Sequence, residues 1–179
     1  MKMIFVKIIT VLVAIVSIAL VVAMFTKNKY TIRREIIIDK PKAEVFDFIK
    51  LNRNQKLYSK WLLLDPATKI EITGTDGTAG SVLTFESKHH KTGKGEWEIK
   101  KIDNYRIDFE LRFLAPYVFT ATGHMETKSL AGNQTKLIWI YNSGMNWPKN
   151  FMLIFFDMDK IIGADVEESL TNIKTIVEK

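Results

Sequence analysis

The stretch FFDMDKIIGADVEESLTNIK, Phe155–Lys174, decides the fold because its apolar residues recur with the period of an α-helix. Placed about 100° apart around a helix axis, the apolar residues from here to the C-terminus form one stripe. The stripe consists of Phe155, Met158, Ile162, Val166, Leu170, Ile173 and Val177. A stripe of this kind has to be buried, whereas Glu167 and Glu168 lie away from it. We therefore expect one long helix after Pro148 that packs its stripe against a sheet.

The acidic residues of this stretch do not form a metal site. Asp157 and Asp159 are roughly 200° apart around the helix, too far to bind one ion from the same face. His89 and His90 fall at a predicted hairpin end and should point to opposite faces, and His124 should face solvent. Cysteine is absent. The sequence therefore predicts neither a metal site nor a cofactor site.

Asp159 lies at the edge of the apolar stripe, one turn before Gly163. A carboxylate in an apolar cavity needs a partner or has a raised pKa. One interpretation is that Asp159 orients a polar ligand group or moves a proton. The other, which the frequency of structural ion pairs favours, is a tie to a strand hydroxyl, a tyrosine or an arginine.

The region from Ile70 to about residue 144 has the alternating pattern of antiparallel strands, separated by turns rich in Gly, Asn and Asp. The clearest strand is Arg106–Phe113. The apolar parity along these strands predicts one covered face, formed by Leu83, Phe85, Trp97, Ile99, Ile107, Phe109, Leu111, Phe113, Phe119, Ala121, Leu137, Trp139 and Tyr141. Glu96 and Glu98 belong to the solvated face, where cross-strand pairing with a basic residue explains them.

The residues before the sheet predict a strand and two short helices. Residues 30–39 are rich in β-branched residues and predict the first strand. Asp39-Lys40-Pro41 then starts a helix with an apolar stripe of Val45, Phe46 and Ile49. A second helix should cover Asn54–Trp61 and end before Pro66. Together with the meander and the last helix, this order predicts an α+β domain.

The N-terminal segment Ile8–Phe25 has no charged residue in about 18 positions, so a helix would span roughly 27 Å, just enough to cross a bilayer. A cleavable signal peptide is the alternative, because Val21-Val22-Ala23 resembles a cleavage site, but the apolar run is long for one. We expect residues 1–29 to be a single-pass membrane anchor and residues 30–179 a soluble domain. Lysines flank the apolar run on both sides, so the charge distribution does not predict on which side of the membrane the soluble domain lies.

Six segments of the chain, read in order, resemble one family. They are IIIDKPKAEVFDFI, NRNQKLYSKW, GKGEWEI, RIDFELRF, TKLIWIY and MDKIIGADVEESLTNIK. In this order they are similar to the polyketide cyclase/dehydrase and lipid-transport group of the START-like (SRPBCC) superfamily, over about Tyr30–Lys179. The resemblance implies the helix-grip fold, in which a curved antiparallel sheet grips a long C-terminal helix. It also implies a deep pocket between the two for apolar molecules.

The expected cavity residues combine this implied pocket with the covered face of the sheet. They are Phe85, Trp97, Phe109, Leu111, Phe113, Phe119, Trp139, Tyr141, Phe155, Asp159 and Ile162. Met145, Trp147, Phe151 and Met152 lie in the connector to the last helix, and either a pocket mouth or packing against the short helices accounts for them.

These features predict a membrane-anchored START-like domain that binds a hydrophobic or amphipathic small molecule, lipid or polyketide-like, in a cavity between the sheet and the C-terminal helix. No catalytic set is identified. The alternatives are an enzyme of the cyclase or dehydratase type that uses the same cavity, and a protein-interaction module. Nucleic acid is not an expected partner, because the net charge of +6 is not concentrated in one patch. The segment GTDGTAG lacks the lysine of a phosphate-binding loop.

Overall fold

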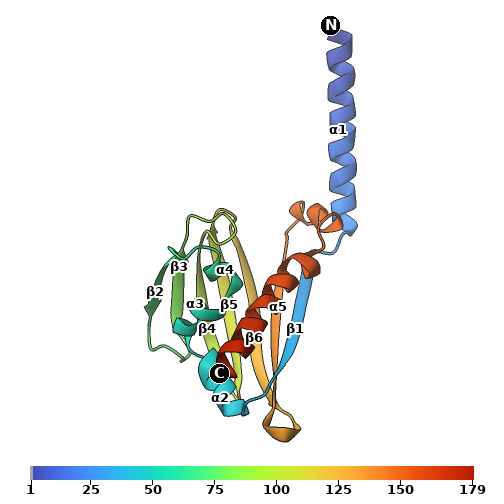
Figure 1. The fold of residues 1–179 in the computed structure, drawn as a ribbon. Coiled ribbons are helices and arrows are strands. Elements are labelled where there is room, and N and C mark those ends of the chain that lie inside the picture. Colours follow the sequence, from blue (N-terminus) through green and yellow to red (C-terminus); the bar gives the residue numbers. More distant parts are fainter. Residues whose placement is uncertain (1) are drawn as a thin grey trace. The chain divides into compact units, whose positions relative to one another are not determined.

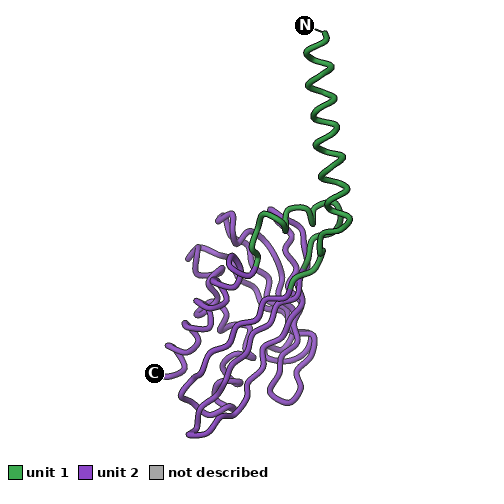
Figure 2. Tube along the Cα trace, turned by 90° about the vertical axis from the view of Figure 1, so that its right-hand side faces the viewer, with its two compact units in different colours: residues 1–30, 144–158 green, residues 31–143, 159–179 purple. Residues whose placement is uncertain are grey.

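The computed structural model describes residues 2–179, which divide into two compact units (Figure 2). The first unit contains the chain up to Tyr30 together with Gly144–Met158. The second contains Thr31–Ser143 and Asp159–Lys179. The first unit thus adds a later segment to the predicted anchor.

The first unit is built on the helix α1 (Lys2–Phe25) and the 3₁₀ helix η3 (Lys149–Ile154). In the part of the chain that the structure describes, α1 alone is long and apolar enough to cross a membrane, with a mean hydropathy of 3.1. Signal sequences pass the same test. The buried side chain of Asn150 joins the two helices, because its Nδ2 donates hydrogen bonds to the carbonyls of Ala23 (2.7 Å) and Thr26 (2.9 Å).

The second unit contains a sheet that curves around the helix α5 (Met158–Val177; Figure 1). Among residues 2–179 the sheet has seven strands in the order β1-β7-β6-β5-β4-β3-β2. Their bounds are β1 Lys29–Ile38, β2 Lys69–Thr73, β3 Val82–Glu86, β4 Lys94–Asp103, β5 Arg106–Ala115, β6 Phe119–Ser129 and β7 Thr135–Gly144. The meander from β2 to β7 is antiparallel throughout, as consecutive hairpins require.

The predicted parity of the strands is confirmed. In β5, Ile107, Phe109 and Leu111 are buried, and the residues between them are partly exposed. The register places Leu111 opposite both Trp97 and Ala121, which brings buried side chains of three strands together. On the other face, Arg112 forms ion pairs with Glu96, Glu98 and Glu110, so the predicted cross-strand pairing of the two glutamates is also present.

The prediction of one long helix after Pro148 is wrong. The chain forms η3 first, and α5 begins only at Met158. The break follows because Asn150 is bound to the end of α1, and residues 155–157 leave the helical path before α5 starts. Phe155 consequently lies outside α5 instead of in its buried stripe, and 67% of its surface is exposed. The predicted stripe is confirmed along the rest of α5, where its buried residues are Val166, Leu170, Ile173 and Val177.

The second predicted helix is divided into short pieces. The first helix is α2 (Lys42–Ile49), followed by η1 (Asn52–Asn54), α3 (Gln55–Tyr58) and α4 (Lys60–Leu63). The break between α3 and α4 is at Ser59, whose backbone is extended. Side chains of α5 satisfy the backbone groups freed there: Ser169 Oγ accepts from the Lys60 N–H (2.9 Å), and Asn172 Nδ2 donates to the Tyr58 carbonyl (3.1 Å).

Candidate functional site

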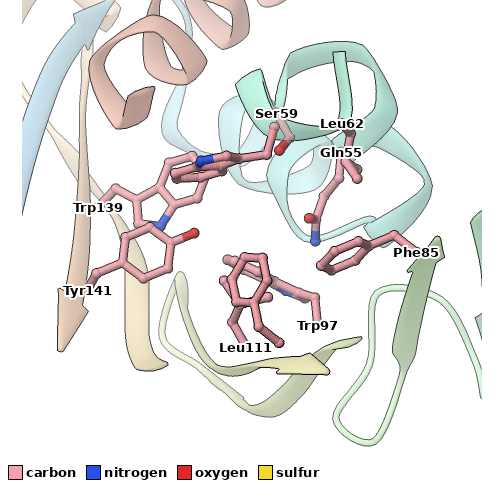
Figure 3. Close-up of a pocket in the computed structure, with 10 residues that line it drawn as sticks. Gln55, Ser59, Leu62, Phe85, Trp97, Leu111, Trp139 and Tyr141 are labelled. Carbon is pink, nitrogen blue, oxygen red and sulfur yellow. The ribbon is translucent and has the colours of Figure 1, made fainter. Parts of the chain in front are cut away.

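A cavity lies between the concave face of the sheet and the helices α3 and α4 (Figure 3). Strands β3, β4, β5 and β7 and the two helices supply its lining. The lining residues are Gln55, Ser59, Trp61, Leu62, Phe85, Trp97, Leu111, Phe113, Trp139 and Tyr141. None of them belongs to α5, so the cavity is not placed between the sheet and the C-terminal helix as predicted. Trp61 and Leu62 of α4 contribute to the lining instead.

The aromatic side chains fill most of this cavity. Trp97 stacks on Phe109 with ring centroids 3.8 Å apart, and Trp139 stacks on Tyr141 at 5.6 Å. Only about 20 Å³ is left for water-sized molecules between the side chains. One water molecule fits such a space, whereas sites for small ligands typically measure ~300–1,000 Å³. A larger ligand therefore requires the wall to move.

Two polar atoms of the lining, Trp139 Nε1 and Tyr141 Oη, are buried and make no hydrogen bond of ordinary geometry with a described protein group, although Trp139 approaches the Tyr141 hydroxyl as a weak hydrogen-bond partner. The two side chains are only 2% and 4% exposed. The Tyr141 hydroxyl points into the cavity (Figure 3). Burial raises the pKa of Tyr141 well above its ordinary value, so the group is a neutral O–H at physiological pH. An unpaired buried donor is costly, which distinguishes the Tyr141 hydroxyl from the other polar side chains of the lining, Gln55 and Ser59.

Comparisons with known proteins rest on structure alone, since no family model and no curated protein matches the sequence. The Zhui aromatase/cyclase from Streptomyces is 12% identical with a TM-score of 0.59, over 84% of this chain and 94% of that one. The protein CV1439 from Chromobacterium violaceum is 13% identical with a TM-score of 0.59, over 83% and 97%. The di-domain ARO/CYC BexL is 15% identical with a TM-score of 0.60, over 84% of this chain and 50% of BexL.

The chain has the helix-grip fold. The fold predicted from the START-like resemblance is therefore confirmed. Within this helix-grip domain, six of the predicted cavity residues line the cavity, namely Phe85, Trp97, Leu111, Phe113, Trp139 and Tyr141. Gln55, Ser59, Trp61 and Leu62 line it as well but were not predicted. Trp61 and Leu62 are apolar residues at and just beyond the end of the second predicted helix, but no local signal indicates that the polar Gln55 and Ser59 line a cavity.

The other five predicted cavity residues lie outside the lining. Phe109 is buried behind Trp97, and Phe119 stacks on Phe113 at 4.5 Å but is 37% exposed. Ile162 is half-buried on α5, and Phe155 precedes that helix in an exposed position. Asp159 is exposed as well, with 58% of its side chain accessible.

Asp159 is paired with Arg34 of β1. This pairing agrees with the interpretation that Asp159 binds a neighbouring side chain, and not with a role in orienting a ligand in the cavity. Arg34 Nη1 and Nη2 each donate to one carboxylate oxygen at 2.9 Å, and Nη2 also donates to the Asp159 carbonyl. The guanidinium crosses α5 over Gly163, where a Cβ atom would overlap it. These hydrogen bonds lower the pKa of Asp159, the opposite of the raised pKa expected in an apolar cavity.

Replacing Asp159 with asparagine is expected to lower stability slightly at neutral pH, because the ion pair is exposed and screened. The folded-state pKa of Asp159 is depressed, so its contribution is present above the unfolded value of ~3.9 and is lost as pH falls through the folded value. Urea titrations of both chains near neutral pH and at successively lower pH measure this difference, which should shrink as the pH falls.

Arg34→Gln supplies the control for this pair. It removes the guanidinium that binds Asp159, so Asp159→Asn should have no further effect in that background. An undiminished effect of Asp159→Asn in the Arg34→Gln chain would show that Arg34 is not its partner.

Asp165 is the carboxylate that sequence analysis missed. It borders the apolar stripe on the edge opposite to Asp159 and is half-buried near Trp61. Burial raises the pKa of Asp165, whereas the charges of Lys91 and Lys60 and a hydrogen bond with Trp61 oppose the rise. Asp165 does not line the cavity, but it holds the indole that does.

The three histidines lie at two separate places in the fold. His89 and His90 do not point to opposite faces, because they lie in a turn and their rings stack 4.8 Å apart. His124 lies on the outer face of β6, opposite Asp108 of β5, and burial lowers its pKa. Residues 2–179 contain no group of three or more His, Cys, Asp or Glu side chains placed to hold an ion.

Proposed function

We propose that the chain is anchored in a membrane by α1 and that its helix-grip domain binds a neutral, mainly apolar small molecule that carries a hydrogen-bond acceptor. The observation that carries the proposal is the Tyr141 hydroxyl, a buried O–H that has no acceptor of ordinary hydrogen-bond geometry, in an aromatic cavity. A carbonyl or hydroxyl oxygen of a ligand would accept this hydrogen bond, and the aromatic rings would bury the rest of the molecule.

The proposed ligand is neutral because the lining has no charged partner for it. None of the ten lining residues is a lysine, arginine, histidine, aspartate or glutamate. A charged group in this site would be buried without compensation, at a cost well above that of a neutral polar group. This chemistry also gives the cyclase or dehydratase alternative little support, since Asp159 is exposed and paired with Arg34.

Entry of the ligand requires α3 and α4 to move away from the sheet. Each has four residues, and the extended Ser59 separates them. Such short helices contain few internal hydrogen bonds and open at lower cost than the strands. The bonds from Ser169 and Asn172 to this region would have to break or shift as the wall opens.

Membrane anchoring is supported by the end of α1. The helix is apolar around its circumference, and nearly all of its large side chains are exposed. A signal peptidase cut after Ala23 would remove one of the two carbonyls that bind the buried Asn150 side chain. The first unit is therefore complete only with α1 attached, which favours the anchor over the signal peptide.

Leu111→Phe tests the cavity, because it adds bulk where little free space remains. The full chain, purified from membranes in mild detergent, is incubated with a total lipid extract, and bound molecules are measured by native mass spectrometry. We expect Leu111→Phe to weaken binding by on the order of tenfold, equivalent to ~1.4 kcal/mol. Tyr141→Phe should weaken it less, by about one hydrogen bond.

Leu114→Phe is the matched control, since Leu114 lies on the same strand but is exposed on the other face. It should bind as the original chain does. Equal binding by all three variants, with their unfolding transitions preserved, would rule out this cavity as the binding site.

A further inference from the structure

The segment Met145–Phe156 of the first unit exposes several large apolar side chains although it is not part of α1. The exposed fractions are 55% for Trp147, 43% for Met152, 51% for Ile154, 67% for Phe155 and 45% for Phe156. Single exposed apolar residues are common, but five within ten positions form a patch. Such a patch requires a partner that covers it.

This segment is fixed to the C-terminal end of α1. Trp147 Nε1 donates to the Leu20 carbonyl at 3.4 Å, and the buried Asn150 side chain donates to the carbonyls of Ala23 and Thr26. The Met145 N–H donates to the Asn28 carbonyl at 2.9 Å. The segment therefore runs beside residues 20–28, as the green trace of Figure 2 shows.

The position along α1 sets the depth of the segment in a bilayer. The apolar run Ile8–Phe25 spans roughly 27 Å, close to the ~30 Å of the hydrocarbon core. Leu20 to Phe25 then occupy the last ~8 Å of that span. A segment bound to these residues lies at the boundary between acyl chains and head groups.

The composition of the segment fits this boundary. Tryptophan concentrates at membrane interfaces because its ring is apolar and its N–H is polar. Lys27, Lys29 and Lys149 are exposed beside the apolar side chains, where they can reach lipid phosphates. Exposed apolar side chains and exposed cations within the same unit match the two layers of an interface.

We infer that residues 145–156 form a second membrane-contacting element, seated in the interface of the same phospholipid bilayer that α1 spans. This inference rests on the membrane anchoring proposed above. The bilayer is the occupant because the segment is continuous with the apolar surface of α1. The element holds the end of α1 at a fixed depth.

Site-directed spin labelling tests the inference, and the absence of cysteine makes the chain well suited to it. Single cysteines replace Met152 and Phe155 in the full chain, which is reconstituted in vesicles of phosphatidylcholine and phosphatidylglycerol. Two further single-cysteine variants are the references: Val13→Cys in α1 for a position in lipid, and Thr175→Cys, at an exposed position of α5, for a position in water. Collision rates with oxygen, which partitions into lipid, and with a water-soluble nickel chelate are then compared.

We expect the labels at positions 152 and 155 to collide at least severalfold more often with oxygen than with the nickel chelate. The ratio of the two collision rates should lie between the ratios measured at positions 13 and 175. The inference would be overturned if the nickel chelate reached positions 152 and 155 as readily as position 175 while position 13 remained in lipid. That result would leave the anchor intact. Protection from both reagents would overturn it in favour of a contact with protein. A water-accessible position 13, or its loss by cleavage, would remove the anchor as well.

Discussion

Trp139→Ala is expected to lower the free energy of unfolding by about 3–5 kcal/mol, the usual cost of truncating a large buried aromatic residue. Trp139 is 2% exposed and lies at the centre of the aromatic cluster. It packs edge-on against Tyr58 of α3 and Trp97 of β4, both at 6.1 Å. Its loss therefore removes contacts on the helices and on the sheet at once.

Urea unfolding of the full chain in mild detergent, followed by near-ultraviolet circular dichroism, measures this loss. Trp147→Ala is the control, because Trp147 is more than half exposed and belongs to the other unit. It should change the transition of the helix-grip domain by less than about 0.5 kcal/mol. Equal losses for the two variants would contradict the central place of Trp139 in the core.

Leu170→Ala is expected to cost about 2–5 kcal/mol, because it removes the middle of the apolar stripe with which α5 packs on the sheet. Leu170 is 1% exposed, and Val166 and Ile173 on either side are fully buried. The cavity left by the truncation is confined by strands, which relax little. The same urea titration measures the change.

Ile161→Ala provides the matched control, since Ile161 is an apolar residue of the same helix and is 51% exposed. The cost there should stay below about 1 kcal/mol. If Ile161→Ala destabilised the domain as much as Leu170→Ala, the buried face of α5 would be assigned incorrectly. The comparison is independent of the proposed ligand, so it separates the fold from its function.

Local periodicity was enough to predict the strands and the buried face. Alternation along Arg106–Phe113 predicted which side chains of β5 are buried, because one face of a curved sheet is covered and the other is wet. The helical spacing of Val166, Leu170 and Ile173 likewise predicted the buried side of α5. These patterns repeat within one element, so they need no knowledge of what the element meets.

Interactions between distant residues decided what periodicity could not. The division of α3 and α4 at Ser59 depends on Ser169 and Asn172, more than 100 positions away, and the end of η3 depends on Asn150 binding α1. No local signal contains these contacts. The predicted continuous helices were therefore wrong at the places where tertiary hydrogen bonds replace helical ones.

The sequence by itself determined the helix-grip fold, the apolar N-terminal helix and the aromatic character of the concave face. Only the tertiary structure decided which helices close the cavity and which polar atoms stay unpaired inside it. It also assigned Asp159 to Arg34, because an edge position on a helix is equally compatible with a cavity and with a neighbouring strand. The pairing is set by the approach of β1 over Gly163, a contact between residues 129 positions apart that the sequence order does not reveal.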